Sequence, residues 1–391
     1  AGAKAMPSIE DVTFIDPCAG SGHILVYAFE VFYQIYRSLG YAPEQIPEKI
    51  LTHNIYGLDI DDRAKQLSIL SAMLVARTHD KDIFNKHITL NITSVAESNG
   101  MSELPGLLKG ASKDTAEYLV DTFRDAKEYG SILRVKPQDY TDLQSQLDNL
   151  PPLDKALYHA KATQLIHQAG ILSRTYTIAV TNPPYMNKYD AKLKAYINTN
   201  YPESKSDLFA VFMEVLLNYI DNDGIMGMIN PDSWMFLTSY AKLRESIFNV
   251  AHIETMYHLD YIFADVVVHT TAFTIKKGNA SGTSGDYIRL VDVNNLDKKP
   301  QIASEASQDL SSERRHKASN ADFEVFPGKI IAYWASEAVN HVLRHSEPLK
   351  TIADPRQGLA TTDTNKYIRL WHEVPIDGID FKRKSRTDAK D

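Results

Sequence analysis

The sequence has very little of what builds disulfides, metal centres or membrane spans. Of its 391 residues only Cys18 is a cysteine, which excludes an intramolecular disulfide and is typical of the reducing cytoplasm. Its 13 histidines lack the spacing of metal ligands, so we expect no metal site. There is no apolar run of bilayer length and no signal-peptide pattern. We therefore expect a cytoplasmic protein without membrane contact.

Positive charge is also scarce. The net charge of -8 at pH 7 disfavours a general nucleic-acid binder, because phosphate contacts need Lys and Arg. Basic residues nevertheless gather locally, in a loop and in the C-terminal tail: Lys188, Lys192, Lys194, Lys205, Lys382, Arg383, Lys384 and Arg386. Such clusters permit a contact with DNA but do not by themselves indicate one.

The most informative stretch is residues 177–185, Thr-Ile-Ala-Val-Thr-Asn-Pro-Pro-Tyr. A β-prone run ends where two prolines fix φ and remove backbone donors, which predicts a rigid loop at the carboxyl edge of a strand. Open α/β sheets bind ligands at that edge. Stacking on Tyr185, with hydrogen bonds to Asn182 and to the Pro183 carbonyl, would suit a flat base that carries an amino group. The alternative is an ordinary Asn-Pro surface turn.

A second motif lies near the start of the chain. A short β-prone run, residues 11–16, ends at Asp16 and is followed by Pro-Cys-Ala-Gly-Ser-Gly and then an apolar stretch of helical length, residues 24–36. A strand, a glycine turn and then a helix is the order with which nucleotide-binding folds begin. In such a turn, Gly20 and Gly22 would let a ligand approach the backbone. Residues 54–60 predict the second strand, and Asp59 at its end is placed to accept hydrogen bonds from both ribose hydroxyls of a ligand.

The remaining chain supplies the rest of a sheet and some additional segments. Further strands are expected at residues 88–95, 225–230, 253–258 and 270–276. Residues 99–173 are polar and helix-prone, which predicts an inserted helical segment. We find no catalytic or ligand-binding motif in it. Residues 278–320 read as a mostly irregular excursion around a strand-like stretch at 287–293.

Together the two motifs resemble the paired signature of S-adenosylmethionine-dependent amino methyltransferases. The order, with Asp16-Pro-Cys-Ala-Gly-Ser-Gly22 first and Asn182-Pro-Pro-Tyr185 second, resembles adenine-N6 DNA methyltransferases of the γ type. The fuller run, with Asn-Ile-Tyr-Gly-Leu-Asp-Ile-Asp-Asp-Arg-Ala, Asn-Pro-Pro-Tyr-Met and Gln-Gly-Leu-Ala-Thr, is most similar to the PglX methyltransferases of BREX phage-defence systems. The resemblance covers residues 11–276 and, more weakly, 320–374.

The resemblance implies roles for individual residues. The methionine end of S-adenosylmethionine would be lined by Asp16, Ala19, Gly20 and Gly22. Asp59 would hold the ribose, while Pro184 and Phe209 would border the adenine pocket of the cofactor. On the substrate side, the catalytic residues would be Asn182, Pro183, Tyr185 and Phe263: the first two accept hydrogen bonds from the target amine, and the two rings sandwich a flipped base.

The resemblance also implies the architecture and the partners. We expect a Rossmann-like α/β fold with a seven-stranded mixed sheet, a helical insertion and the start of a C-terminal domain. The expected boundaries are 1–98 for the cofactor half, 99–173 for the insertion, 174–280 for the target-base half, 281–320 for a linker and 321–391 for a target-recognition region that is cut short. Little chain precedes the first strand, whereas the family has a helical segment there. The expected partners are double-stranded DNA with a flipped adenine and other BREX proteins.

Other functions compete with this interpretation. Asn-Pro-Pro-Tyr also suits methylation of a protein glutamine or of an RNA amine, whose enzymes are typically more compact. A non-catalytic DNA-binding scaffold is disfavoured by the intact motifs. A cytosine-C5 enzyme would need a cysteine after the fourth strand, and Cys18 lies in the first loop instead. A dehydrogenase is disfavoured because Gly20-Ser21-Gly22 lacks a third glycine at the expected spacing.

Overall fold

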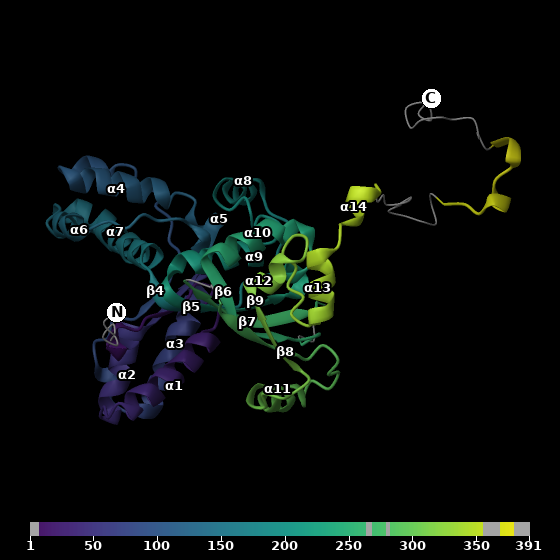
Figure 1. Ribbon diagram of the computed structural model, residues 1–391. Coiled ribbons are helices and arrows are strands. Elements are labelled where there is room, and N and C mark those ends of the chain that lie inside the picture. Colours follow the sequence, from purple (N-terminus) through teal and green to yellow (C-terminus); the bar gives the residue numbers. More distant parts are fainter. Residues whose placement is uncertain (1–7, 263–267, 279–281, 355–367, 379–391) are drawn as a thin grey trace. The chain divides into compact units, whose positions relative to one another are not determined.

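The computed structural model describes residues 8–262, 268–278, 282–354 and 368–378 (Figure 1). The contacts within the chain divide it into two compact units, residues 1–340 and 341–391. The second unit contains the end of α13 (Glu337–His345), the short helix α14 (Leu349–Ile352) and two 3-10 turns within residues 371–378. The sheet and both predicted motifs belong to the first unit.

The first unit is built on a mixed sheet with the strand order β3-β2-β1-β4-β5-β7-β6-β8-β9. The strands are β1 (Phe14–Asp16), β2 (Ile55–Asp59), β3 (Asn91–Ser94), β4 (Tyr176–Thr181), β5 (Ile220–Pro231), β6 (Ala251–His258), β7 (Thr270–Lys277), β8 (Ser284–Arg289) and β9 (Arg315–Ser319). β1 pairs in parallel with β2 on one side and with β4 on the other. The chain therefore turns in opposite directions after β1 and after β4, and a crevice opens at the carboxyl edge between their loops.

Successive side chains of β1 point to opposite faces of the sheet, and each face has its own core. Phe14 packs with α1 (His23–Ser38) and α3 (Asp62–His79), whereas Ile15 packs with α9 (Leu208–Tyr219) and the inserted helices. The α1 helix contributes Leu25, Phe29 and Phe32, whose spacing of three to four residues lines one helical face. The other helices are α2 (Ile46–Lys49), α8 (Ala191–Asn200), α10 (Ala241–Val250), α11 (Lys299–Gln308) and α12 (Asn320–Glu324).

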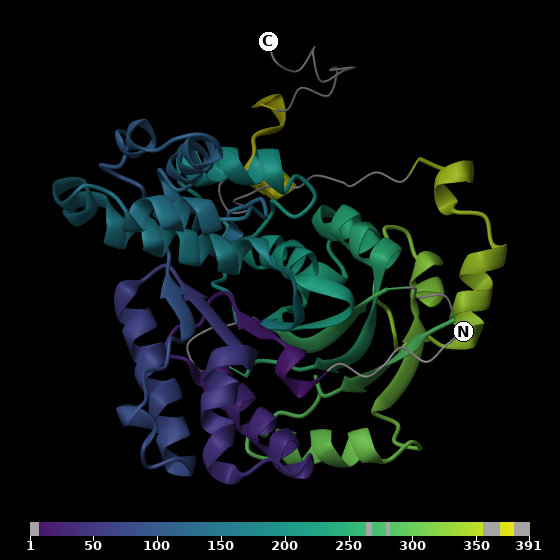
Figure 2. The same cartoon turned by 90° about the vertical axis from the view of Figure 1, so that its left-hand side faces the viewer.

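The segment between β3 and β4 is helical, as expected for an insertion. It contains α4 (Ala111–Thr122), α5 (Ala126–Tyr129), the 3-10 turn η6 (Gly130–Ile132), α6 (Thr141–Asp148) and α7 (Pro152–Ser173). Both views show α4, α6 and α7 grouped together, away from the α1 and α3 pair (Figures 1 and 2). The predicted α/β sheet with a helical insertion is thus confirmed.

The predicted number of seven strands is too low, because the described residues form nine. β8 pairs in parallel with β6, and β9 pairs antiparallel with β8, so both extend the sheet beyond the seven expected strands. Residues 281–320, which were expected to be a mostly irregular linker, supply both strands and α11. The sequence of β9, Arg-His-Lys-Ala-Ser, has no apolar alternation because it is a polar edge strand.

Among the described residues, no helix is both long enough and apolar enough to cross a bilayer.

Candidate active site

The loop after β1 is held in place by the strand and helix that follow it. Asp16, at the end of β1, is 1% exposed, and its Oδ1 accepts hydrogen bonds from the Cys18 N–H (3.0 Å) and the Thr181 hydroxyl (2.7 Å). Its Oδ2 is buried and has no hydrogen-bond partner among the described residues. Burial raises the pKa of Asp16 to about 7. This carboxyl group therefore keeps one buried oxygen that no described residue satisfies.

Both glycines of this loop adopt positive φ, which explains why glycine stands there. Gly20 has φ +54° and Gly22 has φ +85°, values that side chains rarely tolerate. A Cβ at Gly22 would also lie 2.9 Å from the Cα of Ser68, so α3 packs directly against the loop. The hydroxyl groups of Ser68 and Ser71 donate hydrogen bonds to the carbonyls of Gly20 and Ser21, both at 2.9 Å.

Asp59, at the end of β2, joins the second strand to the same loop. Its Oδ2 accepts a hydrogen bond from the Gly20 N–H at 2.8 Å, and its Oδ1 accepts one from the Asp61 N–H at 2.9 Å. The neighbouring Ala19 N–H donates to the Leu58 carbonyl at 2.9 Å. Because each carboxylate oxygen can accept more than one hydrogen bond, Asp59 is oriented by the backbone and can still accept from a ligand.

The Asn-Pro-Pro-Tyr loop follows β4 directly and is much less enclosed. Asn182 and Pro184 are exposed, while Pro183 is buried. The Tyr185 hydroxyl donates to the Ile229 carbonyl of β5 at 3.2 Å and lies 3.4 Å from the Asn182 Oδ1. Burial raises the pKa of Tyr185 to about 12, so its hydroxyl stays protonated at neutral pH.

The loop is supported from behind by α9. The Tyr185 ring packs edge-to-face on Phe209, with centroids 6.3 Å apart. Asp207, the N-cap of α9, accepts hydrogen bonds from the N–H groups of Met186 (3.1 Å) and Phe209 (3.3 Å). Asp207 therefore fixes the distance between the loop and this helix, a role that the sequence did not reveal.

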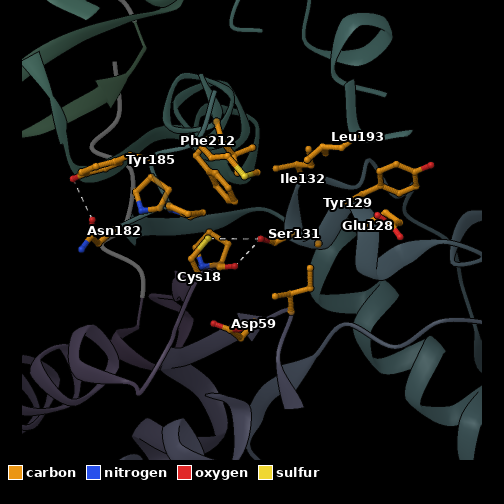
Figure 3. Close-up of a pocket in the computed structure, with 17 residues that line it drawn as sticks. Cys18, Asp59, Glu128, Tyr129, Ser131, Ile132, Asn182, Tyr185, Leu193 and Phe212 are labelled. Atoms are coloured by element: carbon orange, nitrogen blue, oxygen red, sulfur yellow. Dashed lines mark hydrogen bonds between the residues drawn. The ribbon is translucent and has the colours of Figure 1, made fainter. Parts of the chain in front are cut away.

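The two loops share one cavity of about 700 Å³, within the size range of small-molecule sites (Figure 3). Figure 3 shows Asn182 and Tyr185 at one end, Glu128 and Tyr129 at the other, and Cys18, Ser131 and Asp59 between them. The wall is formed by Pro17, Cys18, Asp59, Ile60, Glu128, Tyr129, Gly130, Ser131, Ile132, Asn182, Pro183, Pro184, Tyr185, Met186, Leu193, Leu208 and Phe212.

Not all of the predicted site residues line this cavity. Asp59 and the whole Asn182–Tyr185 loop do, and they lie in one wall although the motifs are far apart in sequence. From the glycine loop, Pro17 and Cys18 line it, whereas Asp16, Ala19, Gly20 and Gly22 do not. Phe209 is 2% exposed and lies behind Tyr185, while Phe212, one turn further along α9, faces the cavity. Phe263 lies outside the described residues.

The insertion supplies a part of the wall that sequence reasoning missed. Residues 128–132 line the cavity, and the Ser131 hydroxyl donates to the Pro17 carbonyl at 2.6 Å. Ser131 also lies 4.0 Å from the Cys18 sulfur, whose pKa is raised by burial. Cys18 is half-buried and lines the cavity with a thiol that stays protonated at neutral pH. Among the described residues, no three His, Cys, Asp or Glu side chains gather where a metal ion could bind.

The chain is similar to known proteins. The Eco57I restriction-modification methylase family matches residues 53–263. The chain is 35% identical to the adenine-specific methyltransferase PglX of Lacticaseibacillus casei (strain Zhang), over 95% of this chain and 32% of the relative. It is 34% identical to the adenine-specific methyltransferase BrxX of Escherichia coli O9:H4 (strain HS), over 97% of this chain and 34% of the relative. The chain thus spans about a third of the length of these curated relatives.

A solved structure shares the fold at low sequence identity. A nuclease-deletion mutant of the Type ISP restriction-modification enzyme LlaGI, solved with a DNA substrate mimic, superposes with a TM-score of 0.52 at 12% identity, over 84% of this chain and 25% of that one. The resemblance that the motifs indicated is confirmed by the matches to PglX and BrxX. Since the family model covers more than half of the chain, this protein belongs to the Eco57I restriction-modification methylase family.

Proposed function

We propose that this chain is the catalytic part of an enzyme that transfers a methyl group from S-adenosylmethionine to N6 of adenine in double-stranded DNA, as a self-marking step in phage defence. The observation that carries the proposal is the single cavity lined by both Asp59 and the Asn182–Tyr185 loop. An amino methyltransferase needs one group that binds the cofactor and another that binds the acceptor. A carboxylate suits the ribose of the cofactor, and a rigid loop with an amide and an aromatic ring suits the acceptor base. The adenine-specific names of the relatives support the same acceptor.

The cofactor half fits S-adenosylmethionine by its polar groups. Asp16 has a buried carboxylate oxygen without a hydrogen-bond partner among the described residues, which suits the cationic amine of a methionine. Asp59 is oriented by backbone N–H groups and lines the cavity, which suits ribose hydroxyls. We assign the backbone at Ala19, Gly20 and Gly22 to the methionine end, and Pro184 and Phe209 to the borders of the base pocket. When bound, the cofactor would supply a methyl group already activated by a positively charged sulfur.

The target half positions the acceptor amine. The Asn182 amide oxygen and the Pro183 carbonyl would accept the two N6 hydrogens and hold them out of the ring plane. The nitrogen lone pair is then less delocalised into the ring and points at the methyl group, and alignment of this kind is the main catalytic contribution. Tyr185 would stack on the flipped base, with Phe263 assigned to its other face, and so offset the stacking lost from the duplex.

The flipped adenine implies a DNA duplex laid across the carboxyl edge of the sheet. Lys188, Lys194 and Lys205 follow the Asn-Pro-Pro-Tyr loop in the sequence and are exposed, so they can contact the phosphate backbone. Lys192 is also exposed but pairs with Asp125 at 2.9 Å, and it would have to leave that ion pair to join them. Other BREX proteins are proposed as further partners.

The test is modified-base sequencing of DNA from cells that carry the intact gene, beside cells that carry Asn182→Ala. We expect N6-methyladenine at one sequence motif with the intact gene and its loss with the variant. Removing one positioned hydrogen-bonding group at a reacting centre lowers turnover by about 100-fold or more. The exposed Asn187 of the same loop provides a matched control, and Asn187→Ala should keep the mark.

Other outcomes would separate the competing functions. If N6-methyladenine persists with Asn182→Ala, the assigned role of Asn182 is wrong. If no mark appears in any strain, even with the neighbouring defence genes present, DNA is not the acceptor, and labelled cofactor should be offered with RNA and with protein substrates. Failure to label any of these would favour the non-catalytic scaffold.

A further inference from the structure

Four strands end at the same edge of the sheet as the one that leads into the Asn-Pro-Pro-Tyr loop or beside it. β4 pairs in parallel with β5, both β5 and β6 pair antiparallel with β7, and β6 pairs in parallel with β8. The last residues of these four strands, Thr181, Pro231, His258 and Arg289, therefore lie along one edge. In the order β4-β5-β7-β6-β8, the end of β8 is about 19 Å from the end of β4 at the usual strand spacing. A ligand that lies across this edge can meet both.

Trp334 packs against the ends of β6 and β8 and is held there by aromatic neighbours. Its ring centroid lies 5.8 Å from that of Phe236, 6.2 Å from that of His258 and 4.9 Å from that of Tyr333. Trp334 is nevertheless 38% exposed. No described residue accepts a hydrogen bond from its indole N–H. The packing thus fixes a large ring and an unused donor at the surface.

The support beneath this ring is itself fixed. His258 is buried, and its Nδ1 lies 2.9 Å from the Tyr333 hydroxyl. Its Nε2 lies 3.2 Å from the Asp232 Oδ2, so this carboxylate is engaged within the protein. Neighbours that are held in this way let Trp334 keep one position without a ligand.

Arg289 adds a positive charge beside the ring. Its guanidinium carbon lies 5.0 Å from the centre of the Trp334 ring, which is a cation–π contact. Asp292 is held by Arg314 through two hydrogen bonds of 2.6 and 2.9 Å. Glu313 lines a surface cavity together with Arg289, but within the described part of the chain Arg289 forms no ion pair. Its guanidinium therefore keeps donors for a ligand.

The chemistry of this surface matches a phosphate group. A guanidinium presents its N–H donors in a plane that suits phosphate oxygens, and the indole N–H of Trp334 adds an uncharged donor. About half or more of the hydrogen bonds between proteins and DNA go to phosphate and sugar. With a rise of about 3.4 Å per base pair, the distance from β4 to β8 corresponds to about five or six base pairs. A duplex with its flipped base at Asn182 is therefore long enough to reach Arg289.

We propose that Arg289 and Trp334 bind the phosphate backbone of the DNA duplex about five base pairs from the target adenine and hold the duplex across the sheet edge. This inference rests on the proposed function, because it takes DNA as the acceptor. A contact to phosphate positions the duplex and carries no sequence information. It should therefore strengthen binding to DNA of any sequence by a similar factor.

The experiment measures binding of the intact protein to a fluorescent duplex that contains the methylated motif, over a range of salt concentrations. Arg289→Gln should weaken binding about tenfold and lower the slope of log affinity against log salt by about one, because one phosphate contact is lost. Arg289→Lys keeps the charge and should keep most of the slope. Trp334→Leu should weaken binding about threefold without changing the slope, since the indole N–H is uncharged.

Shortened duplexes test the distance from the target. The duplex is cut to about three base pairs on one side of the target adenine or on the other, which is shorter than the distance to β8. The difference between wild type and Arg289→Gln should disappear with one of these duplexes and persist with the other. A difference that persists with both would place Arg289 close to the target base and overturn the proposed contact.

Arg37→Gln is the matched control for the loss of one charge. Arg37 is exposed and lies in the last turn of α1, which begins at the carboxyl edge of the sheet and runs toward the opposite edge. This variant should keep the affinity and the slope of the wild type. An equal loss of slope in Arg37→Gln would show that net charge alone is responsible, which overturns the inference.

Two further outcomes separate this inference from the proposed function. If Arg289→Gln and Trp334→Leu both bind the duplex as the wild type does, the surface is left for a protein partner and the inference is wrong, while the proposed function stands. If the wild-type protein neither binds nor methylates the duplex, it is the proposed function that fails.

Discussion

The loops after β1 and β4 leave the same edge of the sheet, yet they satisfy their polar groups in opposite ways. Asp16, in the first loop, is 1% exposed and accepts two hydrogen bonds from the protein. Asn182, in the second, is exposed, and its side chain makes one long contact of 3.4 Å with the Tyr185 hydroxyl. The fold satisfies most polar groups of the first loop and leaves the Asp16 Oδ2 without a partner among the described residues, whereas the second loop presents exposed polar groups that the fold leaves largely unpaired.

This difference has a structural cause. The first loop is enclosed between the end of β2 and the N-terminal part of α3, which donate or accept at Gly20 and Ser21. The second loop carries two prolines that fix its φ angles, and α9 supports it from behind, so it is held firmly although Asn182 is exposed. Under the proposed function, the cofactor would bind a prebuilt loop, while the acceptor amine would meet groups that are fixed but not yet hydrogen-bonded. Such preorganised groups favour catalysis because they need little rearrangement.

The largest effect that separates the two loops is expected for Asp59→Ala. Loss of the proposed hydrogen bonds to the ribose, together with the bond from the Gly20 N–H, should weaken S-adenosylmethionine binding about 100-fold. Methyl transfer at saturating cofactor should fall far less, since the acceptor loop is untouched. Calorimetry for affinity and single-turnover kinetics for transfer measure the two effects separately.

A neighbouring acid provides the control for this variant. Asp61 caps α3 by accepting the Arg63 N–H at 2.9 Å and does not line the cavity. Asp61→Asn preserves the cap and removes one carboxylate, so cofactor affinity should stay within about twofold. Unchanged cofactor affinity in Asp59→Ala would contradict the assignment of Asp59 to the ribose. It would also contradict the proposal that one loop binds the cofactor and the other binds the acceptor.

A smaller effect is a pH dependence that belongs only to the first loop. Burial raises the pKa of Asp16 to about 7, so the acid is largely protonated in the free protein below that pH. Its contribution to the free energy of unfolding is full below about pH 4 and is lost as the pH rises through 7. A cationic amine at the unpaired oxygen favours the carboxylate, so binding lowers this pKa and releases a proton. Cofactor affinity should therefore fall about tenfold from pH 8 to pH 6.

Asp16→Asn is the control for the pH profile. The variant should bind the cofactor more weakly, and its affinity should depend less on pH because Asp16 no longer titrates. The number of protons released on binding, measured in buffers of different ionisation enthalpy, should also fall. The same slope in wild type and Asp16→Asn would mean that another group titrates, and that Asp16 does not face the amine.

Much of the sheet and both loops could be predicted because the necessary signals are local. The β-prone runs end at Asp16, Ile60 and Thr181, and the strands end at Asp16, Asp59 and Thr181 in the structure. The choice between Phe209 and Phe212 could not be made, because both lie on α9 and the rotation of the helix about its axis is set by tertiary packing. The sequence therefore indicated the helix but not which ring faces the cavity.

The contribution of the insertion could not be predicted for a different reason. Ser131 bonds to Pro17 across 114 residues of sequence, and nothing in residues 128–132 resembles a ligand-binding motif. Its role depends on where α5 and α7 place it, which only the tertiary contacts decide. Strand β9 was missed because the usual signal, alternation of apolar residues, is weak in a polar edge strand.

The smallest predicted effect belongs to the second loop and concerns the Tyr185 hydroxyl. Tyr185→Phe keeps the ring on Phe209 and removes the hydrogen bond to the Ile229 carbonyl, so the loop is held less firmly. One such bond contributes about 1 kcal/mol, and turnover should fall about fivefold while cofactor affinity stays unchanged. Because burial raises the pKa of Tyr185 to about 12, the ratio of wild-type to variant turnover should be constant from pH 6 to pH 9. If Tyr185→Phe instead weakened cofactor binding about fivefold as well, the two loops would act as one unit. A change in the loop after β4 would then alter binding at the loop after β1.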